Sequence, residues 1–181
     1  MKRAIITPAP ITADALDELK HWLVIAGTQE DPGLTALLRA ALDLCEAFTG
    51  TAPLELEAEE ILPATAGWQP LATRPVGTIV SAQTIASDGT RQPIASSGIA
   101  FDIDAGGVAR VNLSDPQDAR RMAIRFTAGL APDWTSLPAA MRHGIVRMAA
   151  HNYRERDRTP DPTPPAAIAA MWQPWRRMRL L

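Results

Sequence analysis

Apolar residues recur at helical spacing in three separate stretches of the chain. In the clearest stretch, 31–49, the apolar positions repeat with a period of 3.6 residues. Asp31 and Pro32 are typical of a helix start, and Gly50 is typical of a helix end. A helix over 12–25 is predicted in the same way, with Thr12 as its N-cap.

A third helix is predicted over 137–158, with Ser136 as its cap. Its apolar edge and that of helix 31–49 are both long enough to need burial against a partner, so the two are predicted to pack together. The predicted core comprises Leu34, Leu37, Leu38, Ala41, Cys45, Phe48, Met141, Ile145 and Met148. The opposite side of the third helix carries Arg142, Arg147, Arg154 and Arg158. These arginines are typical of a solvated or ion-paired face, with a nucleic-acid surface as the alternative.

Between the second and third helices the period changes from 3.6 to 2, which predicts a β-rich insert over 54–128. Leu54–Ala58 alternates apolar and acidic residues, and Ile99, Phe101 and Ile103 alternate with small or acidic ones. The dipeptide Asp88-Gly89 indicates a hairpin turn. The predicted class is therefore α+β: a bundle of about three helices, an inserted block of short antiparallel strands, and a C-terminal extension.

The C-terminal extension begins with four prolines in the stretch 159–165, which predicts a stiff, extended linker between a domain over 1–158 and a tail over 159–181. The tail beyond the linker interleaves aromatic and aliphatic residues with arginines. An apolar segment that follows such a linker either docks onto a partner or packs back onto its own domain. Tryptophan and arginine dominate interface energetics, which favours the partner.

Composition and charge narrow the function classes. The 181 residues carry a net charge of −2, but eight arginines face only three acidic residues after Ser136, so the chain is polarised. Such polarity suits a subunit that meets other subunits end to end. The single cysteine, Cys45, excludes an internal disulfide and belongs to the apolar stripe of its helix. No stretch approaches the length of a membrane span, so no membrane partner is expected.

The chain offers no recognisable catalytic motif. It contains no nucleophile elbow, phosphate loop or dinucleotide fingerprint, so no enzyme activity, cofactor or catalytic residue is predicted. His143 and His151 are eight residues apart rather than four, so they do not form a helical metal pair and no metal site is predicted. The acidic run Glu55, Glu57, Glu59 and Glu60 is typical of the solvated face of an edge strand, with a cation site as the alternative.

Several of these stretches, in this order, resemble the head–tail connector (adaptor, or head-completion) proteins of long-tailed bacteriophages and related gene transfer agents. The resemblance covers most of residues 12–158. The matching stretches are Leu16-Asp-Glu-Leu-Lys-His-Trp-Leu23, Asp31–Leu37, Ala40-Ala41, Glu46-Ala-Phe-Thr-Gly50, Arg74-Pro75-Val76, Asp88-Gly89, Ala128-Gly129, Leu137-Pro138-Ala-Ala-Met141 and His151-Asn-Tyr-Arg-Glu-Arg156.

The resemblance implies a structural role without catalysis. It implies a ring, typically of twelve copies, beneath the portal protein at the head–tail interface of the particle. During assembly the subunits would be in the host cytoplasm. The ring would extend the channel for double-stranded DNA in transit, without sequence readout, and would contact the next tail component. The expected portal-binding residues are Trp172, Trp175, Arg176, Arg177, Met178, Arg179, Leu180 and Leu181. The alternative is a nucleic-acid-binding module that uses the arginine-rich C-terminal helix and tail.

Overall fold

The computed structural model describes residues 2–115, 119–155 and 163–176, and its fold is α+β, as predicted. The chain forms two compact units, each built from two pieces of sequence. One unit contains Met1–Ala9 and Glu55–Gly129, and the other contains Pro10–Leu54 and Leu130–Leu181. This division differs from the predicted boundary at 158/159, because the N-terminal residues join the sheet and the C-terminal segment joins the helices.

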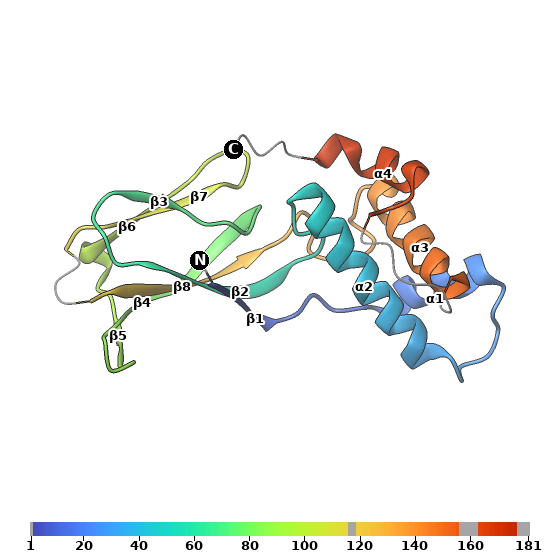
Figure 1. The fold of residues 1–181 in the computed structure, drawn as a ribbon, viewed down its shortest axis with the longest axis horizontal. Coiled ribbons are helices and arrows are strands. Elements are labelled where there is room, and N and C mark those ends of the chain that lie inside the picture. Colours follow the sequence, from blue (N-terminus) through green and yellow to red (C-terminus); the bar gives the residue numbers. More distant parts are fainter. Residues whose placement is uncertain (1, 116–118, 156–162, 177–181) are drawn as a thin grey trace. The chain divides into compact units, whose positions relative to one another are not determined.

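The second unit is helical and contains four α-helices in the described residues (Figure 1). They are α1 (Ala13–Leu23), α2 (Asp31–Thr49), α3 (Ala139–Arg154) and α4 (Ala166–Trp172), and a 3₁₀ turn, η2 (Gln173–Trp175), follows α4. Helices α2 and α3 each pack against the three other helices, so together they form the centre of this unit.

Helix boundaries differ from the predicted ones where backbone geometry overrides residue type. Helix α1 ends at Leu23 rather than at the predicted residue 25, because Val24 takes a left-handed conformation (φ 60°) and Ile25 N donates to Lys20 O. Ser136 does not cap α3, because its amide donates to Asp133 Oδ1 at 2.8 Å and the N-cap is Pro138. Helix α2 begins at Asp31 and is capped by Gly50 (φ 71°).

The helical core contains most of the residues that the apolar stripes indicated. Seven of them are buried: Leu34, Leu38, Ala41, Cys45, Met141, Ile145 and Met148. The two others, Leu37 and Phe48, are half-buried. Burial raises the pKa of the Cys45 thiol, and the nearby Glu46 carboxylate raises it further to a smaller extent. The thiol therefore stays protonated, as expected of a core residue and not of a nucleophile.

The first unit holds two antiparallel sheets. The five-stranded sheet has the order β1 (Lys2–Thr7), β2 (Leu56–Pro63), β8 (Arg121–Ala128), β4 (Val76–Ile85), β5 (Arg91–Pro93). The three-stranded sheet has the order β3 (Trp68–Pro70), β7 (Ala109–Leu113), β6 (Ile99–Ile103), and a 3₁₀ turn, η1 (Ser96–Gly98), precedes β6. Strands β2 to β8 occupy the predicted insert, whereas β1 comes from the N-terminus. The sequence pattern did not indicate β1 or β3 as strands of a sheet.

Strand β2 shows how the sheet separates its acidic residues. Its burial alternates along Leu56–Pro63, with Glu57 and Glu59 half-exposed and Ala58 and Glu60 buried. Glu60 is fully buried, and its carboxylate accepts hydrogen bonds from Thr73 N (2.7 Å), Thr73 Oγ1 (2.6 Å) and Ala72 N (2.8 Å). The Glu60 side chain therefore holds the loop between β3 and β4, which a solvated face would not do.

The turn between β6 and β7 contacts the start of β4 through Gly107. Gly107 has φ 71°, and a Cβ there would overlap Pro75. Its carbonyl accepts a hydrogen bond from Val76 N at 2.8 Å, and the Asp104 carboxylate accepts from Gly106 N and Val108 N within the turn. This turn therefore requires glycine for two reasons, its backbone conformation and the closeness of Pro75.

We expect Gly107→Ala to destabilise the protein more than Gly89→Ala. Gly89 also has a left-handed φ (88°), but no atom lies within 4 Å of where its Cβ would stand. The Gly89 variant should cost about 1–2 kcal/mol from backbone strain alone, and the Gly107 variant should cost more because it also overlaps Pro75. Equilibrium unfolding in urea measures both values, and equal losses would contradict a tight Gly107–Pro75 contact.

Candidate functional site: the C-terminal segment on the helical unit

The C-terminal segment is anchored to the helical unit by Trp172. This side chain is 0% exposed, and its indole Nε1 donates a hydrogen bond to Met141 O on α3 at 3.3 Å. The indole lies over Gly144, where a Cβ would come within 3.0 Å of Trp172 Cδ1 and still closer to the indole nitrogen. The absence of a side chain at Gly144 therefore makes the space that Trp172 occupies.

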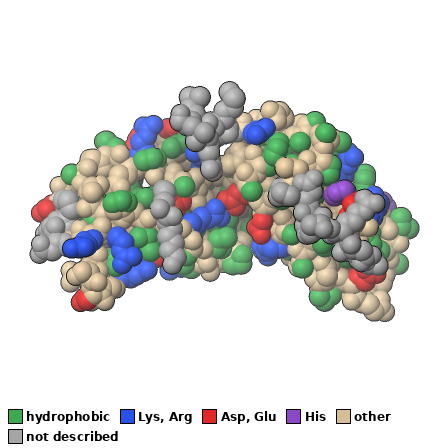
Figure 2. Space-filling model, viewed as in Figure 1, with side chains coloured by type: hydrophobic (Ala, Val, Ile, Leu, Met, Phe, Trp, Pro, Cys, Tyr) green, Lys and Arg blue, Asp and Glu red, His purple; other side chains and the backbone are tan. Residues whose placement is uncertain are grey.

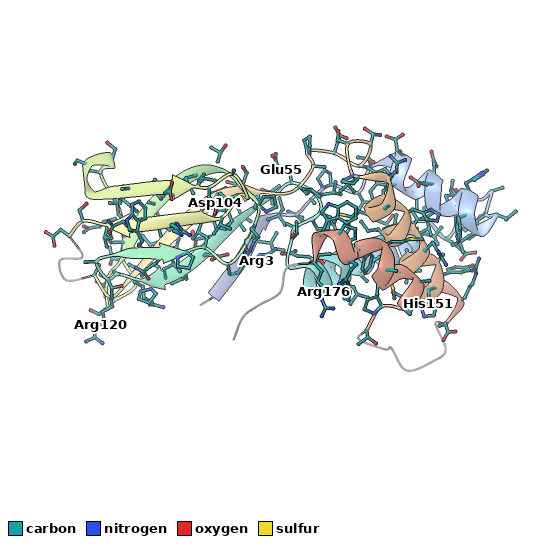
Figure 3. The ribbon with its side chains drawn as sticks, turned by 90° about the horizontal axis from the view of Figure 1, so that it is seen from above. Arg3, Glu55, Asp104, Arg120, His151 and Arg176 are labelled. Atoms are coloured by element: carbon teal, nitrogen blue, oxygen red, sulfur yellow. The ribbon has the colours of Figure 1, made fainter. Side chains whose placement is uncertain are left out.

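Phe48, near the end of α2, completes the contact with the segment. Its ring lies 6.1 Å from the Trp172 ring, centroid to centroid, with the planes tilted by 50°. The Arg176 guanidinium carbon lies 4.8 Å from the centroid of the same Phe48 ring, a cation–π distance. Phe48 thus contacts residues before and after η2, and Arg176 is the last described residue (Figure 3).

The stiff proline linker predicted that the tail projects away from the domain, and this prediction is wrong for residues 163–176, which pack on the helical unit. Trp172 and Ile168 are buried, Trp175 is half-buried, and Arg176 is exposed except for its contact with Phe48. The remaining expected portal-binding residues, Arg177, Met178, Arg179, Leu180 and Leu181, lie outside the described residues, as do 159–162 of the predicted linker. The alternative that the sequence left open, packing onto the chain's own domain, is the one observed for the described part.

The arginines of α3 do not form one basic surface. Arg142 Nε lies 3.4 Å from Glu18 Oε2 of α1, and the same carboxylate oxygen accepts a hydrogen bond from Trp134 Nε1 at 3.0 Å. Arg147 is half-buried, Arg154 is exposed, and Arg158 lies outside the described residues. On the face seen in Figure 2, acidic side chains lie among the basic ones. This arrangement does not favour the nucleic-acid alternative.

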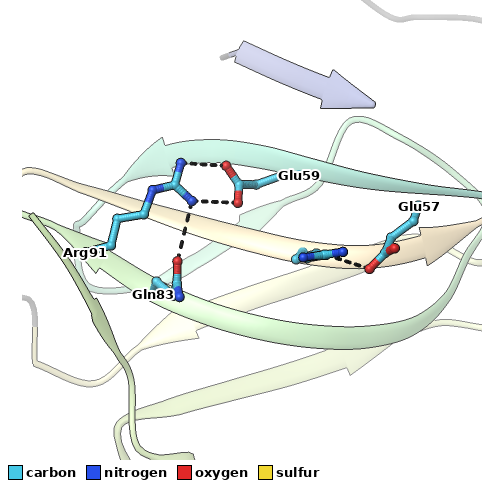
Figure 4. A network of polar contacts seen from close by, with 5 residues as sticks. Glu57, Glu59, Gln83 and Arg91 are labelled. Carbon is cyan, nitrogen blue, oxygen red and sulfur yellow. Dashed lines mark hydrogen bonds and ion pairs between the residues drawn. The ribbon is translucent and has the colours of Figure 1, made fainter. Parts of the chain in front are cut away.

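The outward face of the five-stranded sheet carries a set of paired charges (Figure 4). Arg91 makes two hydrogen bonds to the Glu59 carboxylate, at 2.7 and 2.8 Å, and a weaker one to Gln83. Arg125 Nε donates to Glu57 Oε1 at 2.6 Å, and the Thr7 hydroxyl donates to the other oxygen of that carboxylate. Glu57 and Glu59 were predicted to lie on an edge strand, which is wrong because β2 lies between β1 and β8.

These pairs set the protonation of the two carboxyls. The hydrogen bond from Arg125 holds the pKa of Glu57 below its usual value, and the hydrogen bond from Arg91 does the same to the pKa of Glu59. Both residues are therefore negatively charged at neutral pH, and each is balanced by its arginine. The alternative of a cation site gains no support, because within the described ranges no group of three possible ligand residues is placed to hold a metal.

We expect the stability of the wild-type protein to fall as the pH drops below about 4.5. A carboxyl whose folded pKa is depressed contributes stability above its unfolded pKa, near 4.5 for Glu, and that contribution disappears as the pH falls through the lower folded value. The variant Glu57→Gln/Glu59→Gln should therefore show a shallower loss of melting temperature between pH 5 and about pH 3. Parallel curves for the two proteins would contradict a role for these pairs.

Sequence reasoning did not identify two residues that shape this molecule. Gly144 interrupts no pattern in α3, and its role becomes visible only when Trp172 lies over it. Glu60 looked like one more member of an acidic run, although its even spacing from the apolar residues Leu56, Ala58 and Leu62 was a signal for the buried face. Within the described part of the chain, no helix has the length and apolarity that crossing a bilayer requires.

Comparison with solved structures gives matches over the whole chain. One match is a chain from the "neck of empty GTA particle computed with C6 symmetry", where GTA stands for gene transfer agent. The two chains are 25% identical and superpose with a TM-score of 0.81. The match covers 100% of this chain and 98% of that chain. Two others, from the virion of a native gene transfer agent particle and from the neck of the native particle computed with C12 symmetry, have the same identity and coverage with TM-scores of 0.76. The chain is thus similar in fold and length to a component of a gene transfer agent particle neck.

Two other comparisons gave no match: no protein-family model matches the chain, and no curated protein matches it.

Proposed function

We propose that this chain is a structural subunit of the neck of a gene transfer agent or phage particle, and specifically the adaptor that forms a ring under the portal. The observation that carries the proposal is the similarity of the whole chain, at 25% identity, to a neck chain. The symmetries of the similar neck structures, C6 and C12, support several copies of the subunit around one axis. The ring would extend the DNA channel, contact the next tail component, and locate the protein at the head–tail interface.

The portal-docking element we propose is the C-terminal segment, with a changed role for Trp172. Because Trp172 is fully buried against α3, we assign it the role of anchoring the segment on the helical unit rather than that of a portal contact. We assign contact with the portal to the residues that follow it, from Trp175 to Leu181, because their arginines suit an acidic portal surface. A single segment binds weakly, and a ring of segments binds firmly through avidity.

Particles assembled with variant subunits test this proposal. Removing residues 177–181 should leave the melting temperature within a few degrees of wild type, since the Trp172 contact remains, but should abolish recovery of the subunit in purified particles. Trp22→Ala is a control for the loss of an exposed apolar side chain elsewhere on the same unit, because Trp22 is 41% exposed, and this variant should assemble normally. Normal incorporation of the truncated chain would show that the portal is bound elsewhere.

Binding to a short DNA duplex across a salt titration separates this proposal from a nucleic-acid-binding module. A ring that lets DNA slide through needs no tight phosphate contacts, and a self-neutralised face such as that of Glu57, Glu59, Arg91 and Arg125 provides none. A reader would show sub-micromolar affinity that falls steeply with salt. We expect weak binding without sequence preference.

A further inference from the structure

The edge strands of the two sheets differ in how far they are protected against pairing with another strand. Among the described strands, β1 and β5 are the edges of one sheet, and β3 and β6 are the edges of the other. Natural proteins protect edges with short strands and prolines, since free backbone groups recruit other strands. Strands β3 and β5 are protected in this way: each has three residues and ends in proline, Pro70 and Pro93. Strands β1 and β6 are longer and contain no proline.

Hydrogen bonds at both ends of β6 decide which of its backbone groups face outward. Ser114 N donates to Gly98 O at 2.9 Å, and Asp104 N donates to Val108 O at 3.1 Å. Alternate residues of an antiparallel strand bond to the same neighbour, so Ala100 and Asp102 also direct their backbone groups toward β7. The N–H and C=O groups of Ile99, Phe101 and Ile103 therefore point to the open edge.

Two apolar side chains of β6 are also partly exposed. Phe101 pairs with Val111 and Ile103 pairs with Ala109, both of which are buried, so Phe101 and Ile103 lie on the buried face of their sheet. They are nevertheless 38% and 39% exposed. One further strand beside β6, apolar at alternate positions, would cover both side chains and pair three outward backbone positions.

Strand β1 has the complementary features. It is the outermost strand beyond β2 (Figure 4), and its register is regular from Lys2 to Ile5 and shifts between Ile5 and Thr7. Ile5 pairs with the buried Ala58, so it lies on the buried side of its own sheet, yet it is 48% exposed. Two edge strands that differ from each other, and that are neither short nor ended by proline, permit head-to-tail contact between copies, which closes into a ring when the rotation allows it.

We propose that β6 of one copy pairs with β1 of a second copy, and that this pairing is the ring contact between subunits. The proposal rests on the proposed function as a neck ring, and the C6 and C12 symmetries of the similar neck structures favour closure over an open filament. In this contact Ile5 of one copy covers Phe101 or Ile103 of the next. The bonds are mainly between backbones, so the same contact can repeat around the ring.

Disulfide trapping in assembled particles tests the pairing. The variant Ile5→Cys/Phe101→Cys is oxidised in purified particles and run on a non-reducing gel, and Ile99→Cys or Ile103→Cys replaces the second cysteine to cover neighbouring registers. Cys45 gives no background, because it is 0% exposed and burial raises the pKa of its thiol. We expect a ladder of dimers, trimers and larger multimers from one of the pairs, since each copy offers both edges, and monomers from each single variant.

Every other outcome overturns the proposal. Dimers from Phe101→Cys alone would mean that β6 pairs with β6. A link from Phe101→Cys to a different particle protein would mean that another strand occupies the edge. Monomers from all three pairs, in particles that contain the chain, would mean that the two edges do not meet.

A proline pair gives a second test that needs no cross-link. Ile103→Pro removes an N–H that points to the open edge, so the free protein should melt within a few degrees of wild type while its incorporation into particles falls by about tenfold or more. Asp102→Pro is the matched control, since it removes an N–H bonded to β7 and should destabilise the free protein itself. Normal incorporation of Ile103→Pro would overturn the pairing alone, whereas absence of the wild-type chain from particles would overturn the proposed function.

Discussion

Trp172→Ala is expected to lower the free energy of unfolding of the helical unit by about 3–5 kcal/mol, the range for removing a large buried aromatic side chain. The expected loss is large because Trp172 is 0% exposed and contacts two helices. Its removal leaves a cavity over Gly144, whose lack of a side chain prevents α3 from filling the space. Thermal or urea unfolding of the full chain measures the change.

Two control variants separate the Trp172 contact from a general effect of losing an aromatic residue. Trp175→Ala removes a half-buried tryptophan of the same segment and should cost clearly less. Gly144→Ala introduces a Cβ that overlaps the indole and should cost about 1–3 kcal/mol. That cost should largely vanish in the Trp172→Ala background, because the two residues compete for one space. Additive losses, or a Trp172→Ala loss below 1 kcal/mol, would contradict the observed packing.

Glu60→Ala should be the most destabilising substitution of an acidic residue in the sheet unit, at about 3–5 kcal/mol. The substitution removes the acceptor of Ala72 N, Thr73 N and Thr73 Oγ1, and a buried donor without a partner costs about 1–3 kcal/mol. Two of these donors belong to Thr73, which is itself 4% exposed, so water does not readily replace the carboxylate. Urea unfolding again measures the loss.

Its neighbour in sequence supplies the matched control. Glu59 lies on the opposite face of β2, where its partner Arg91 is exposed. An exposed ion pair contributes about 0–1 kcal/mol, so Glu59→Ala should be nearly neutral at pH 7. Glu60→Gln should fall between the two alanine variants, because one amide oxygen still accepts while the amide nitrogen faces donors. Equal effects of Glu59→Ala and Glu60→Ala would mean that the Glu60 carboxylate does not hold the β3–β4 loop.

Trp172 connects stability with the proposed function, because it lies in the C-terminal segment that we propose docks on the portal. Trp172 anchors residues 163–176 on the helical unit, directly before the residues that we propose bind the portal. Preorganisation of this kind reduces the ordering cost of binding and strengthens a contact made by a short segment. A loss of assembly in Trp172→Ala would then follow from a displaced segment as well as from lower stability, whereas the 177–181 deletion removes only residues that we propose contact the portal.

The local sequence pattern determined those elements in which neighbouring residues all favour the same secondary structure. Helix α2 has an uninterrupted apolar stripe, a proline in its first turn and a glycine at its end, and it forms over the predicted range 31–49. The hairpin at Asp88-Gly89 likewise depends on neighbouring residues alone, with Asp88 Oδ1 accepting from Thr90 N and Gly89 at positive φ. The α+β class followed from the order of such elements.

Tertiary structure alone decided where the two ends of the chain pack. The local sequence of residues 2–7 favours an extended chain, but nothing near them indicates that they pair in a sheet, because their partner β2 begins at Leu56. The predicted projection of the tail failed for a related reason: the site that buries Trp172 is built by Gly144, Met141 and Phe48 from two other helices. Glu60 and Glu59 are adjacent acidic residues with opposite environments, because the pleat of β2 turns one toward Thr73 and the other toward Arg91. Residue type and local spacing determine which segments need burial, whereas the surface that buries them depends on residues distant in sequence.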